Sequence, residues 1–440
     1  MTDERLVRGI VVAFDDLADA HTPDYLEAAI ESASSRPQRP AWTFPGRWLP
    51  MDIATQAAPA ARMPWRQLGI LALLAVLLTV ATAIYIGSRT QLPDPYGPAG
   101  NGLVAYARGT DIVVADPGTG EERVIVSGPE ADLAPRFSRD GTRIVFQRLA
   151  PAPEPGSHVM VVAPDGSGLT ALTDEPLRLF ASQMATPYTF APDGRTVAIA
   201  AVDPDGRPGI LLAQADGSAA RWLDLPVTDM QLHTIREPAF RPPDGSQLLL
   251  TGERLGGGPI VFTVDVATGE VLDTVVDAAG LTGVDTARWS PDGQSISYAI
   301  WSNESFDLSM ENHLIRPDGS GDRVLQAPTG TVWELGGAWS NDGTRMLVVR
   351  GSTSGWDQSR AAIVPTDGSG VGVDIPYPGP IQSGCCYAWE WSPDDSMILG
   401  KPITPSGVPG PQAIVDVDAL TISEAPWNVS DDPAWQRVAP

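Results

Sequence analysis

One short phrase recurs six times along this chain of 440 residues and constrains its fold more than any other feature. In the clearest copy, Trp289 stands before Ser290-Pro291-Asp292-Gly293, and an alternating apolar run continues to Tyr298. Asp-Gly between such runs predicts a tight β-hairpin, because the aspartate bonds the nearby backbone and glycine adopts the positive φ that the turn needs. The copies occupy residues 137–141, 190–194, 240–245, 289–293, 339–343 and 391–395.

The aspartates of these copies recur with a nearly constant period. They are Asp140, Asp193, Asp244, Asp292, Asp342 and Asp394, and their successive spacings are 53, 51, 48, 50 and 52 residues. A second hairpin lies between the copies, with turns such as Asp165-Gly166 and Asp318-Gly319. Two hairpins in every period of about 50 residues predict four-stranded blades, and hence an all-β propeller.

The two ends of the repeat region are expected to share one blade. Residues 102–106 have the pattern of the second strand of a first hairpin, and residues 432–438 have the pattern of its first strand. Pairing these two segments would leave no open edge between the first and last blades. We therefore expect a seven-bladed propeller over residues 101–440, closed by pairing of its terminal strands, with six blades as the alternative.

The repeated phrase resembles the WD40-like (PD40) repeat of TolB-like propellers, in which an aromatic residue precedes Ser-Pro-Asp-Gly and a hydrophobic strand follows. The resemblance implies the fold of residues 101–440 and says little about function. Propellers of this type serve as scaffolds, as accessory domains of peptidases and as sensor domains, and a shared fold does not imply a shared function. The small α/β domain that precedes the propeller in the TolB family has no match in this sequence.

Acidic residues outnumber basic residues by 54 to 29, which gives a formal net charge of −25. No nucleic-acid partner is expected, because proteins that bind nucleic acids carry a basic patch or stripe. We interpret the acidity as a solvated surface rather than as a specific cation site.

The first 67 residues differ in character from the repeats. Thr22-Pro23-Asp24 predicts the start of a short helix, with Thr22 as its N-cap. Residues 36–50 contain four prolines, three arginines and three aromatic residues, which excludes an ordinary helix or a central strand. This extended segment is similar to juxtamembrane segments of bacterial single-span proteins. It is expected either to place Trp42 and Trp48 at the membrane interface or to bind a protein partner.

Residues 68–87 form an uncharged apolar stretch of 20 residues, long enough to span a bilayer core of about 30 Å as a helix. Trp65 and Tyr85 lie near its two ends, as interfacial aromatic residues do, and Arg66 precedes it directly. The sequence therefore predicts a single transmembrane helix in this position.

Basic residues predict how this helix is oriented. Five arginines precede it closely and two follow it at similar reach: Arg36, Arg39, Arg47, Arg62 and Arg66, then Arg89 and Arg108. The positive-inside rule places the N-terminus in the cytoplasm and the propeller outside the cell membrane. The expected parts are a cytoplasmic segment at 1–67, the transmembrane helix at 68–87, a linker at 88–100 and the propeller at 101–440.

The two cysteines, Cys385 and Cys386, are adjacent in sequence. This spacing does not fit a zinc site, and no metal is predicted. In an oxidising compartment they would be able to form a vicinal disulfide, which is a strained ring; the alternative is a pair of free or buried thiols.

No catalytic set is recognised in the sequence. There is no Gly-x-Ser-x-Gly elbow, and the four histidines are scattered without a metal-binding spacing. Turns at 116–121 and 265–270 resemble the Asp-x-x-Thr-Gly turn of quinoprotein propellers, but the tryptophan that closes that motif is replaced by Val124 and Asp273. No cofactor is predicted. An ectoenzyme with a quinone or a metal in the central channel is kept as the alternative function.

Three irregular loops break the repeat and are the expected binding surface, because exposed loops on a rigid scaffold commonly carry function. Their aromatic residues Trp301, Phe306 and Trp356 are predicted either to contact a ligand or to pack between blades. We expect a membrane-anchored propeller that binds a protein, peptide or envelope polymer, or that serves as a scaffold.

Overall fold

The computed structural model describes residues 74–75, 92–151, 156–180, 186–278, 283–304, 307–352, 360–376, 390–400, 412–427 and 433–439. From residue 92 onward the described residues form strands and turns and contain no helix. Residues Thr90–Pro440 constitute one compact unit. The predicted all-β class is confirmed.

Five sheets have four strands each, and three of them take their strands from the first part of the unit. The first sheet contains β28 (Ala434–Val438), β1 (Gly100–Arg108), β2 (Asp111–Ala115) and β3 (Glu122–Val126). The second contains β4 (Asp132–Phe137), β5 (Ile144–Leu149), β6 (Ser157–Val162) and β7 (Thr170–Ala171). The third contains β8 (Tyr188–Phe190), β9 (Thr196–Val202), β10 (Pro208–Gln214) and β11 (Ala220–Trp222).

The other two four-stranded sheets follow the same antiparallel order. One contains β12 (Leu232–Phe240), β13 (Gln247–Arg254), β14 (Gly258–Asp265) and β15 (Val271–Asp277). The other contains β24 (Glu390–Trp391), β25 (Met397–Gly400), β26 (Ala413–Asp416) and β27 (Thr421–Glu424).

The remaining eight strands form one sheet of two antiparallel halves. The first half contains β16 (Gly283–Trp289), β17 (Ile296–Glu304), β18 (Asp307–Ile315) and β19 (Arg323–Val324). The second half contains β20 (Trp333–Leu335), β21 (Arg345–Gly351), β22 (Arg360–Pro365) and β23 (Val373–Asp374). Among the described residues, the strands of the two halves pair at one position, where Met310 of β18 lies parallel to and opposite Trp333 of β20.

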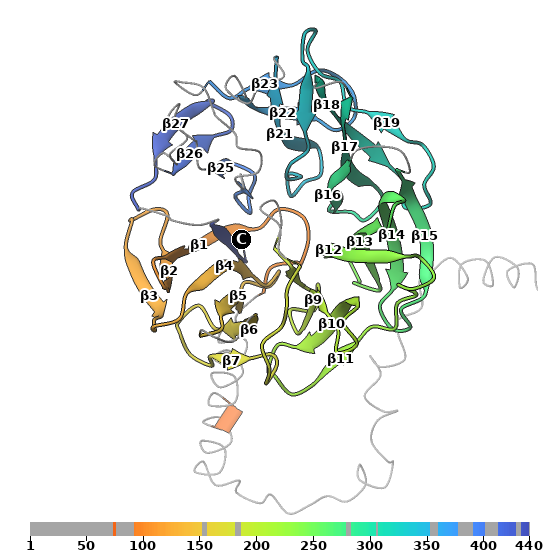
Figure 1. The fold of residues 1–440 in the computed structure, drawn as a ribbon. Coiled ribbons are helices and arrows are strands. Elements are labelled where there is room, and N and C mark those ends of the chain that lie inside the picture. The colour runs from red at the N-terminus through yellow and green to blue at the C-terminus, as the bar shows by residue number, and fades with distance from the viewer. Residues whose placement is uncertain are drawn as a thin grey trace, which may run out of the picture. The chain divides into compact units, whose positions relative to one another are not determined.

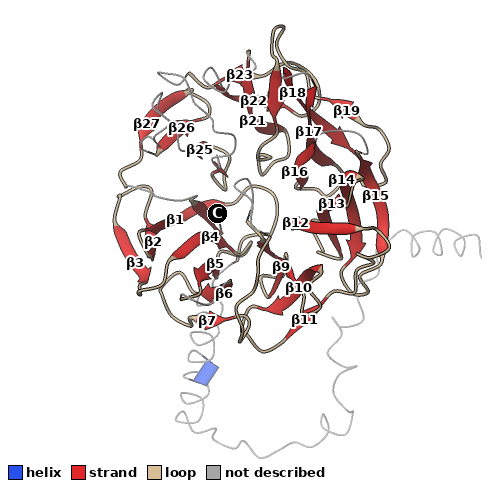
Figure 2. Ribbon diagram, viewed as in Figure 1, coloured by secondary structure: helices blue, strands red, loops and turns tan. Residues whose placement is uncertain are grey.

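The sheets are arranged around a central opening, with β3, β7, β11, β15, β19, β23 and β27 toward the outside (Figure 1, Figure 2). The last strand, β28, pairs with β1, and its residues Ala434 and Val438 face Ala105 and Gly100. The chain therefore begins and ends its ring of sheets in the same sheet.

The repeated phrase forms the turn between the first two strands of each repeat. In the clearest copy, the Ser290 hydroxyl donates to Asp292 Oδ1 at 2.6 Å, and the Gln294 amide donates to the same oxygen at 3.0 Å. The Ser295 amide donates to Ser290 Oγ at 2.9 Å, and Gly293 has a φ of 66°. The aspartates are thus turn residues, as the sequence predicts.

Each of these turns also lies against the preceding sheet. A Cβ on Gly293 would come within 2.2 Å of the carbonyl oxygen of Pro242, which belongs to the turn of the preceding repeat. The indole Nε1 of Trp289 donates to the Ala239 carbonyl of the same neighbour at 3.1 Å. The phrase therefore joins one sheet to the next in addition to closing a hairpin.

Arginines reinforce these junctions from the other side. Arg241 donates from Nε to the Gly293 carbonyl at 3.0 Å, and its guanidinium lies 5.1 Å from the ring centre of Trp289. Arg143 bonds the Gly194 carbonyl in the same way at 2.8 Å. In the sheet that contains β28, Gln436 takes this role, because its amide nitrogen donates to the Gly141 carbonyl at 2.8 Å.

The core lies between neighbouring sheets. One buried cluster contains Ile210 and Leu212 of β10 together with Leu248 and Phe262 of the next sheet. Side chains of this size each contribute about 1.5 to 3 kcal/mol when fully buried. Because strands such as β10 and β14 are buried along nearly their whole length, they carry nearly continuous apolar runs.

Most of the N-terminal part lies outside the described residues. This includes the segment 1–67, with Trp42, Trp48, Trp65 and Arg66, and the predicted span 68–87 with Tyr85, apart from residues 74–75. Among the residues that the structure describes, none belongs to a helix with the length and apolar character that a membrane crossing requires.

We expect the substitution Gly293→Ala to destabilise the protein by about 2 to 5 kcal/mol, because alanine at positive φ costs about 1 to 2 kcal/mol and the new methyl overlaps the Pro242 carbonyl. Gly256→Ala is the matched control. Gly256 has a similar φ of 72°, but nothing lies within 4 Å of its Cβ position, so only about 1 to 2 kcal/mol should be lost. Urea unfolding followed by tryptophan fluorescence measures both. Equal losses in the two variants would contradict the role of the inter-sheet contact.

Candidate functional site

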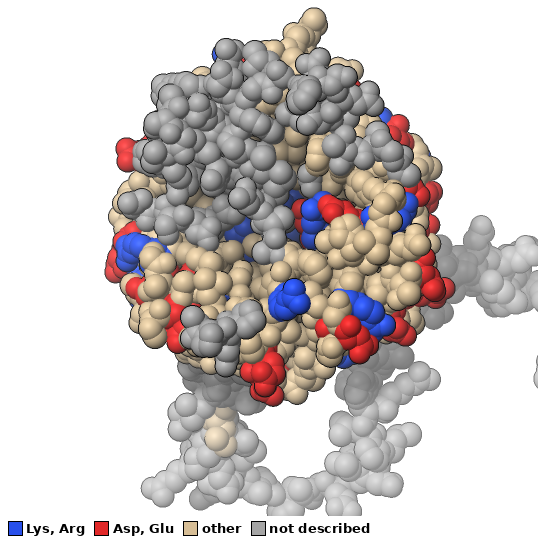
Figure 3. Space-filling view, viewed as in Figure 1, with Lys and Arg blue, Asp and Glu red and all other residues tan. Residues whose placement is uncertain are grey.

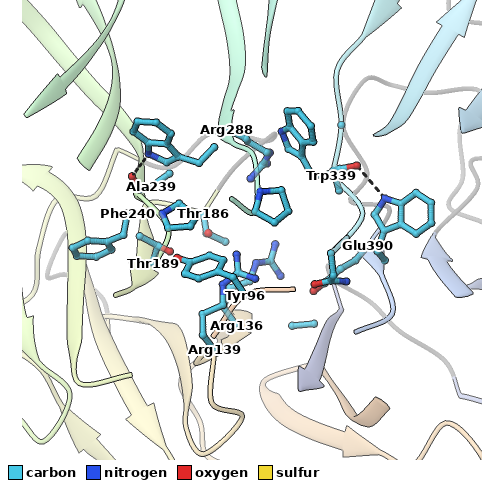
Figure 4. Close-up of a pocket in the computed structure, with 18 of the residues that line it drawn as sticks. Tyr96, Arg136, Arg139, Thr186, Thr189, Ala239, Phe240, Arg288, Trp339 and Glu390 are labelled. Carbon is cyan, nitrogen blue, oxygen red and sulfur yellow. Dashed lines mark hydrogen bonds between the residues drawn. The ribbon is translucent and has the colours of Figure 1, made fainter. Parts of the chain in front are cut away.

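A cavity of about 420 Å³ lies at the centre of the ring of sheets (Figure 4). Its wall contains residues of β4, β8, β12, β16, β20, β24 and β28, and Tyr96 from the segment before β1. Each of these strands is the first strand of its repeat. The cavity is therefore built from residues that are far apart in sequence.

Two positions of the repeated phrase line this cavity. The first is the residue directly before the aromatic residue, and its occupants are Arg136, Thr189, Ala239, Arg288, Ala338 and Glu390. The second lies two residues after the aromatic residue, and its occupants in the wall are Arg139, Pro242, Pro291, Asn341 and Pro393. The aromatic residue between these positions also borders the cavity in all six copies, but its residue type is restricted to Phe or Trp, whereas the two flanking positions vary.

The described wall of the cavity is basic, in contrast to the protein as a whole. Four arginines, Arg136, Arg139, Arg288 and Arg437, are accompanied by two glutamates, Glu237 and Glu390. This leaves an excess of two positive charges in a protein whose formal net charge is −25. Figure 3 shows basic atoms near the centre of this face and acidic atoms mainly toward its edge.

Among the four arginines of the described wall, Arg288 of β16 has the fewest interactions with other protein groups. Its side chain is exposed to solvent inside the cavity, and desolvation by the protein around the cavity lowers the pKa of the guanidinium. The positive charges of Arg136 and Arg139 lower that pKa further, whereas the negative charges of Glu237 and Glu390 raise it. Within the described part of the chain, the guanidinium has no hydrogen bond or ion pair.

Tyr96 brings the segment before β1 into the wall. The guanidinium of Arg139 lies 4.8 Å from the centre of the Tyr96 ring. Burial raises the pKa of the Tyr96 phenol, and the charge of Arg139 opposes that shift. Arg139 itself is exposed and occupies a position where four other copies of the phrase have proline, and it lines the cavity.

Arg437 of β28 is a buried residue of the wall whose guanidinium is held by hydrogen bonds to the protein. It is 5% exposed, and it donates to Asn341 Oδ1 at 2.7 Å and to the carbonyls of Asp94 and Gly97 at 3.0 and 2.6 Å. Burial lowers the pKa of its guanidinium to about 10. These bonds hold the segment before β1 against the last strand, so Arg437 is a structural residue of the site.

Three of the inner strands are distorted beside the cavity. Ala134, Glu237 and Thr286 have φ values of 50°, 59° and 57°, which non-glycine residues adopt rarely. Each lies where the pairing register shifts, in β4, β12 and β16. Such bulges turn the following side chains, and strained backbone of this kind is concentrated at functional sites.

A buried polar cluster lies behind the wall and connects the two halves of the eight-stranded sheet. Glu334 of β20 is 3% exposed and accepts a hydrogen bond from Asn312 Nδ2 of β18 at 3.1 Å. Arg350 lies 3.7 Å from Glu334 and donates from Nε to Asp374 at 2.8 Å. Burial raises the pKa of the Glu334 carboxyl, against the opposing effects of Asn312 and Arg350.

Of the three aromatic residues predicted from the irregular loops, the structure describes one. Trp301 lies in β17, half-buried, opposite Gly283 of β16 and against the apolar cluster that contains Met310 and Trp333. It is not among the described residues that line the cavity. Phe306, Trp356, Cys385 and Cys386 lie outside the described residues.

The turns that resemble those of quinoproteins lie between outer strands. Asp116 Oδ1 accepts from the amides of Gly118 and Thr119, between β2 and β3. Asp265 Oδ1 accepts from the amide of Thr268 at 2.8 Å, between β14 and β15. Both aspartates therefore act as turn residues away from the described cavity wall. The described residues contain no group of three metal-ligating side chains placed to hold an ion.

The Glu334 cluster should make stability depend on pH. Because the folded protein raises the pKa of this carboxyl above its ordinary 4.5, it binds the proton more tightly than the unfolded chain does. Stability from this group is therefore present at low pH and is lost as pH rises through the folded-state pKa.

Glu334→Gln removes that proton equilibrium but keeps an oxygen that accepts from Asn312. We expect the free energy of unfolding of the variant, relative to the natural protein, to increase as pH rises from about 4.5 to 8. Glu424→Gln on the exposed strand β27 is the control and should change stability by less than about 0.5 kcal/mol. A difference between Glu334→Gln and the natural protein that stays constant over this pH range would contradict the assignment.

No protein-family model matches this sequence, and no similar sequence was found among curated proteins. Among solved structures, oligogalacturonate lyase in complex with manganese has a TM-score of 0.53 at 13% identity, over 75% of this chain and 85% of that chain. Puromycin hydrolase has a TM-score of 0.52 at 16% identity, over 78% of this chain and 55% of the hydrolase. TolB from Acinetobacter baumannii has a TM-score of 0.45 at 16% identity, over 76% and 82% of the two chains.

These similarities concern the fold alone, because every identity is below 25%. The similar structures comprise TolB proteins and related propeller proteins, which include enzymes. The propeller fold that the repeated phrase predicts agrees with the similar structures whose TM-scores exceed 0.5.

Proposed function

We propose that this protein is a single-pass membrane-anchored propeller that binds a protein, peptide or envelope polymer outside the cytoplasm, as a sensing or scaffold module. The observation that carries the proposal is the basic cavity at the centre of the ring, in a protein that is otherwise strongly acidic. A partner that enters this cavity meets residues from seven different strands at once.

The cavity has the properties of a binding site for part of a larger molecule. Its volume of about 420 Å³ falls within the range of ligand pockets, about 300 to 1,000 Å³. Its wall combines aromatic residues such as Trp289 and Trp339 with polar and charged groups such as Thr189 and Arg288. A rigid ring that surrounds a cavity of this kind presents its groups with little loss of conformational entropy on binding.

A seven-bladed ring is part of this proposal. In the described part of the chain, the strands of the two halves of the eight-stranded sheet pair only at Met310–Trp333, and each half has the four-stranded order of the other sheets. Counting the halves separately makes seven blades. The pairing of β28 with β1 and the bond from Gln436 to the Gly141 carbonyl support a ring closed within one blade.

The membrane position rests on the sequence. Residues 68–87 have the length and composition of a transmembrane helix, and arginines are enriched before it. We infer a cytoplasmic segment at 1–67, a linker at 88–100 and an extracytoplasmic propeller at 101–440. In this arrangement the linker carries Tyr96, so the segment that leaves the membrane also contributes to the cavity wall.

Topology tests the membrane part of the proposal. In intact spheroplasts of cells that express the chain with a tag at each end, added protease should remove the C-terminal tag and leave the N-terminal tag intact. The expected order follows from the positive-inside rule. Detergent-opened spheroplasts, in which both tags are accessible, provide the control. Protection of the C-terminal tag in intact spheroplasts would place the propeller inside and refute the extracytoplasmic role.

Site-specific crosslinking tests the binding part. A photoreactive residue in place of Thr189, in the cavity wall, should crosslink a partner in intact cells. The same residue in place of Leu169, which is exposed in the turn before the outer strand β7, is the matched control and should not. Adducts formed only from position 169, or from neither position, would show that partners do not enter the cavity.

A further inference from the structure

We propose that the central cavity is an oxyanion-binding site, in which Arg288 and Arg139 hold a carboxylate or phosphate group of the partner. This inference rests on the proposed function, because it names the chemistry of the group that enters the same cavity. It assigns a ligand class to residues that sequence reasoning did not single out.

The first observation that supports this proposal is that the Arg288 guanidinium has no bonding partner among the described residues. A guanidinium enclosed by protein is costly unless it is paired and hydrogen-bonded, because it has lost much of its hydration. The described residues offer Arg288 no such pairing, yet its side chain is exposed to the solvent of the cavity. An oxyanion in the cavity would supply the missing partner, and the planar fork of a guanidinium matches carboxylate and phosphate oxygens in a bidentate manner.

The second support is the position of Arg139. Its repeat position holds proline in three of the other copies that line the cavity, at Pro242, Pro291 and Pro393. Arginine at this position puts an additional charge at the wall, and stacking on the Tyr96 ring at 4.8 Å leaves the edges of the guanidinium as donors. Arg139 and Arg288 line the same cavity, so both guanidinium groups face the space that one bound group would occupy (Figure 4).

The third support is the charge balance of the wall. Arg437 already bonds Asn341 and two backbone carbonyls, so it contributes positive potential rather than direct contact. Glu237 and Glu390 offset part of this potential and leave an excess of two positive charges. A group with one or two negative charges balances that excess, whereas a cation would be repelled by it.

Binding of small oxyanions to the purified full-length protein in detergent micelles tests this site directly. Inorganic phosphate and succinate are the probes, titrated at constant ionic strength by isothermal calorimetry, and chloride is the reference salt. We expect at least one probe to bind. Phosphate binding without succinate binding would identify a phosphorylated ligand group, and the reverse would identify a carboxylate.

Arg288→Met and Arg139→Met should each weaken that binding by about tenfold to a hundredfold, the loss expected for a charged hydrogen-bonded contact. Arg316→Met is the matched control, because Arg316 is exposed in the turn between the outer strands β18 and β19. It should leave the affinity unchanged. The melting temperature of Arg288→Met should not fall, since its guanidinium makes no bond to the described residues, so weaker binding would not result from unfolding.

The proposal is overturned if neither probe binds up to roughly 10 mM, a concentration that detects millimolar affinity. It is also overturned if a probe binds and neither Arg288→Met nor Arg139→Met weakens it. Either result leaves the proposed function to be judged separately, because crosslinking from position 189 reports whether a partner enters the cavity whatever its charge.

Discussion

The close approach of each turn glycine to the preceding sheet is the contact on which the rest of this structure depends. At Gly293 a side chain is excluded twice, by a φ of 66° and by the Pro242 carbonyl at 2.2 Å from the Cβ position. The same turn brings the Trp289 indole to the Ala239 carbonyl and offers its own carbonyl to Arg241. Similar close contacts occur at Gly141 and Gly245, so the turn glycines help to hold neighbouring sheets of the ring together.

The junction also explains why the residues that line the cavity differ from one copy of the repeated phrase to the next. The aromatic residue and the Ser-x-Asp turn are committed to packing and hydrogen bonds between sheets, so they cannot vary freely. The residues before and after them border the central opening, and their residue types differ from copy to copy, although Asn341 and Glu390 also bond a neighbouring sheet. Residues such as Arg288 and Arg139 at these positions set the charge of the cavity. This is how one repeated scaffold can carry different sites.

The sequence was sufficient for the fold class, but it did not single out the residues that line the cavity. The period of the aspartates and the alternating runs predicted an all-β propeller, which the structure confirms. Site prediction relied instead on loop aromatics. Trp301, the one that the structure describes, packs within its sheet beside Gly283. The residue before each aromatic residue of the phrase varies between copies, and this variation was visible in the sequence. Alignment of the repeats alone does not show, however, that this residue faces the central cavity.

The sequence by itself determined the strands, their turns and the chemistry of the junctions, because these depend on neighbouring residues and on a local period. Only the tertiary structure decided that Arg136, Arg288 and Arg437 surround one cavity together with Tyr96. These residues belong to different sheets and to the segment before β1, and no periodic pattern links Tyr96 to them. Their meeting depends on the closing geometry of the whole ring, to which every inter-sheet junction contributes.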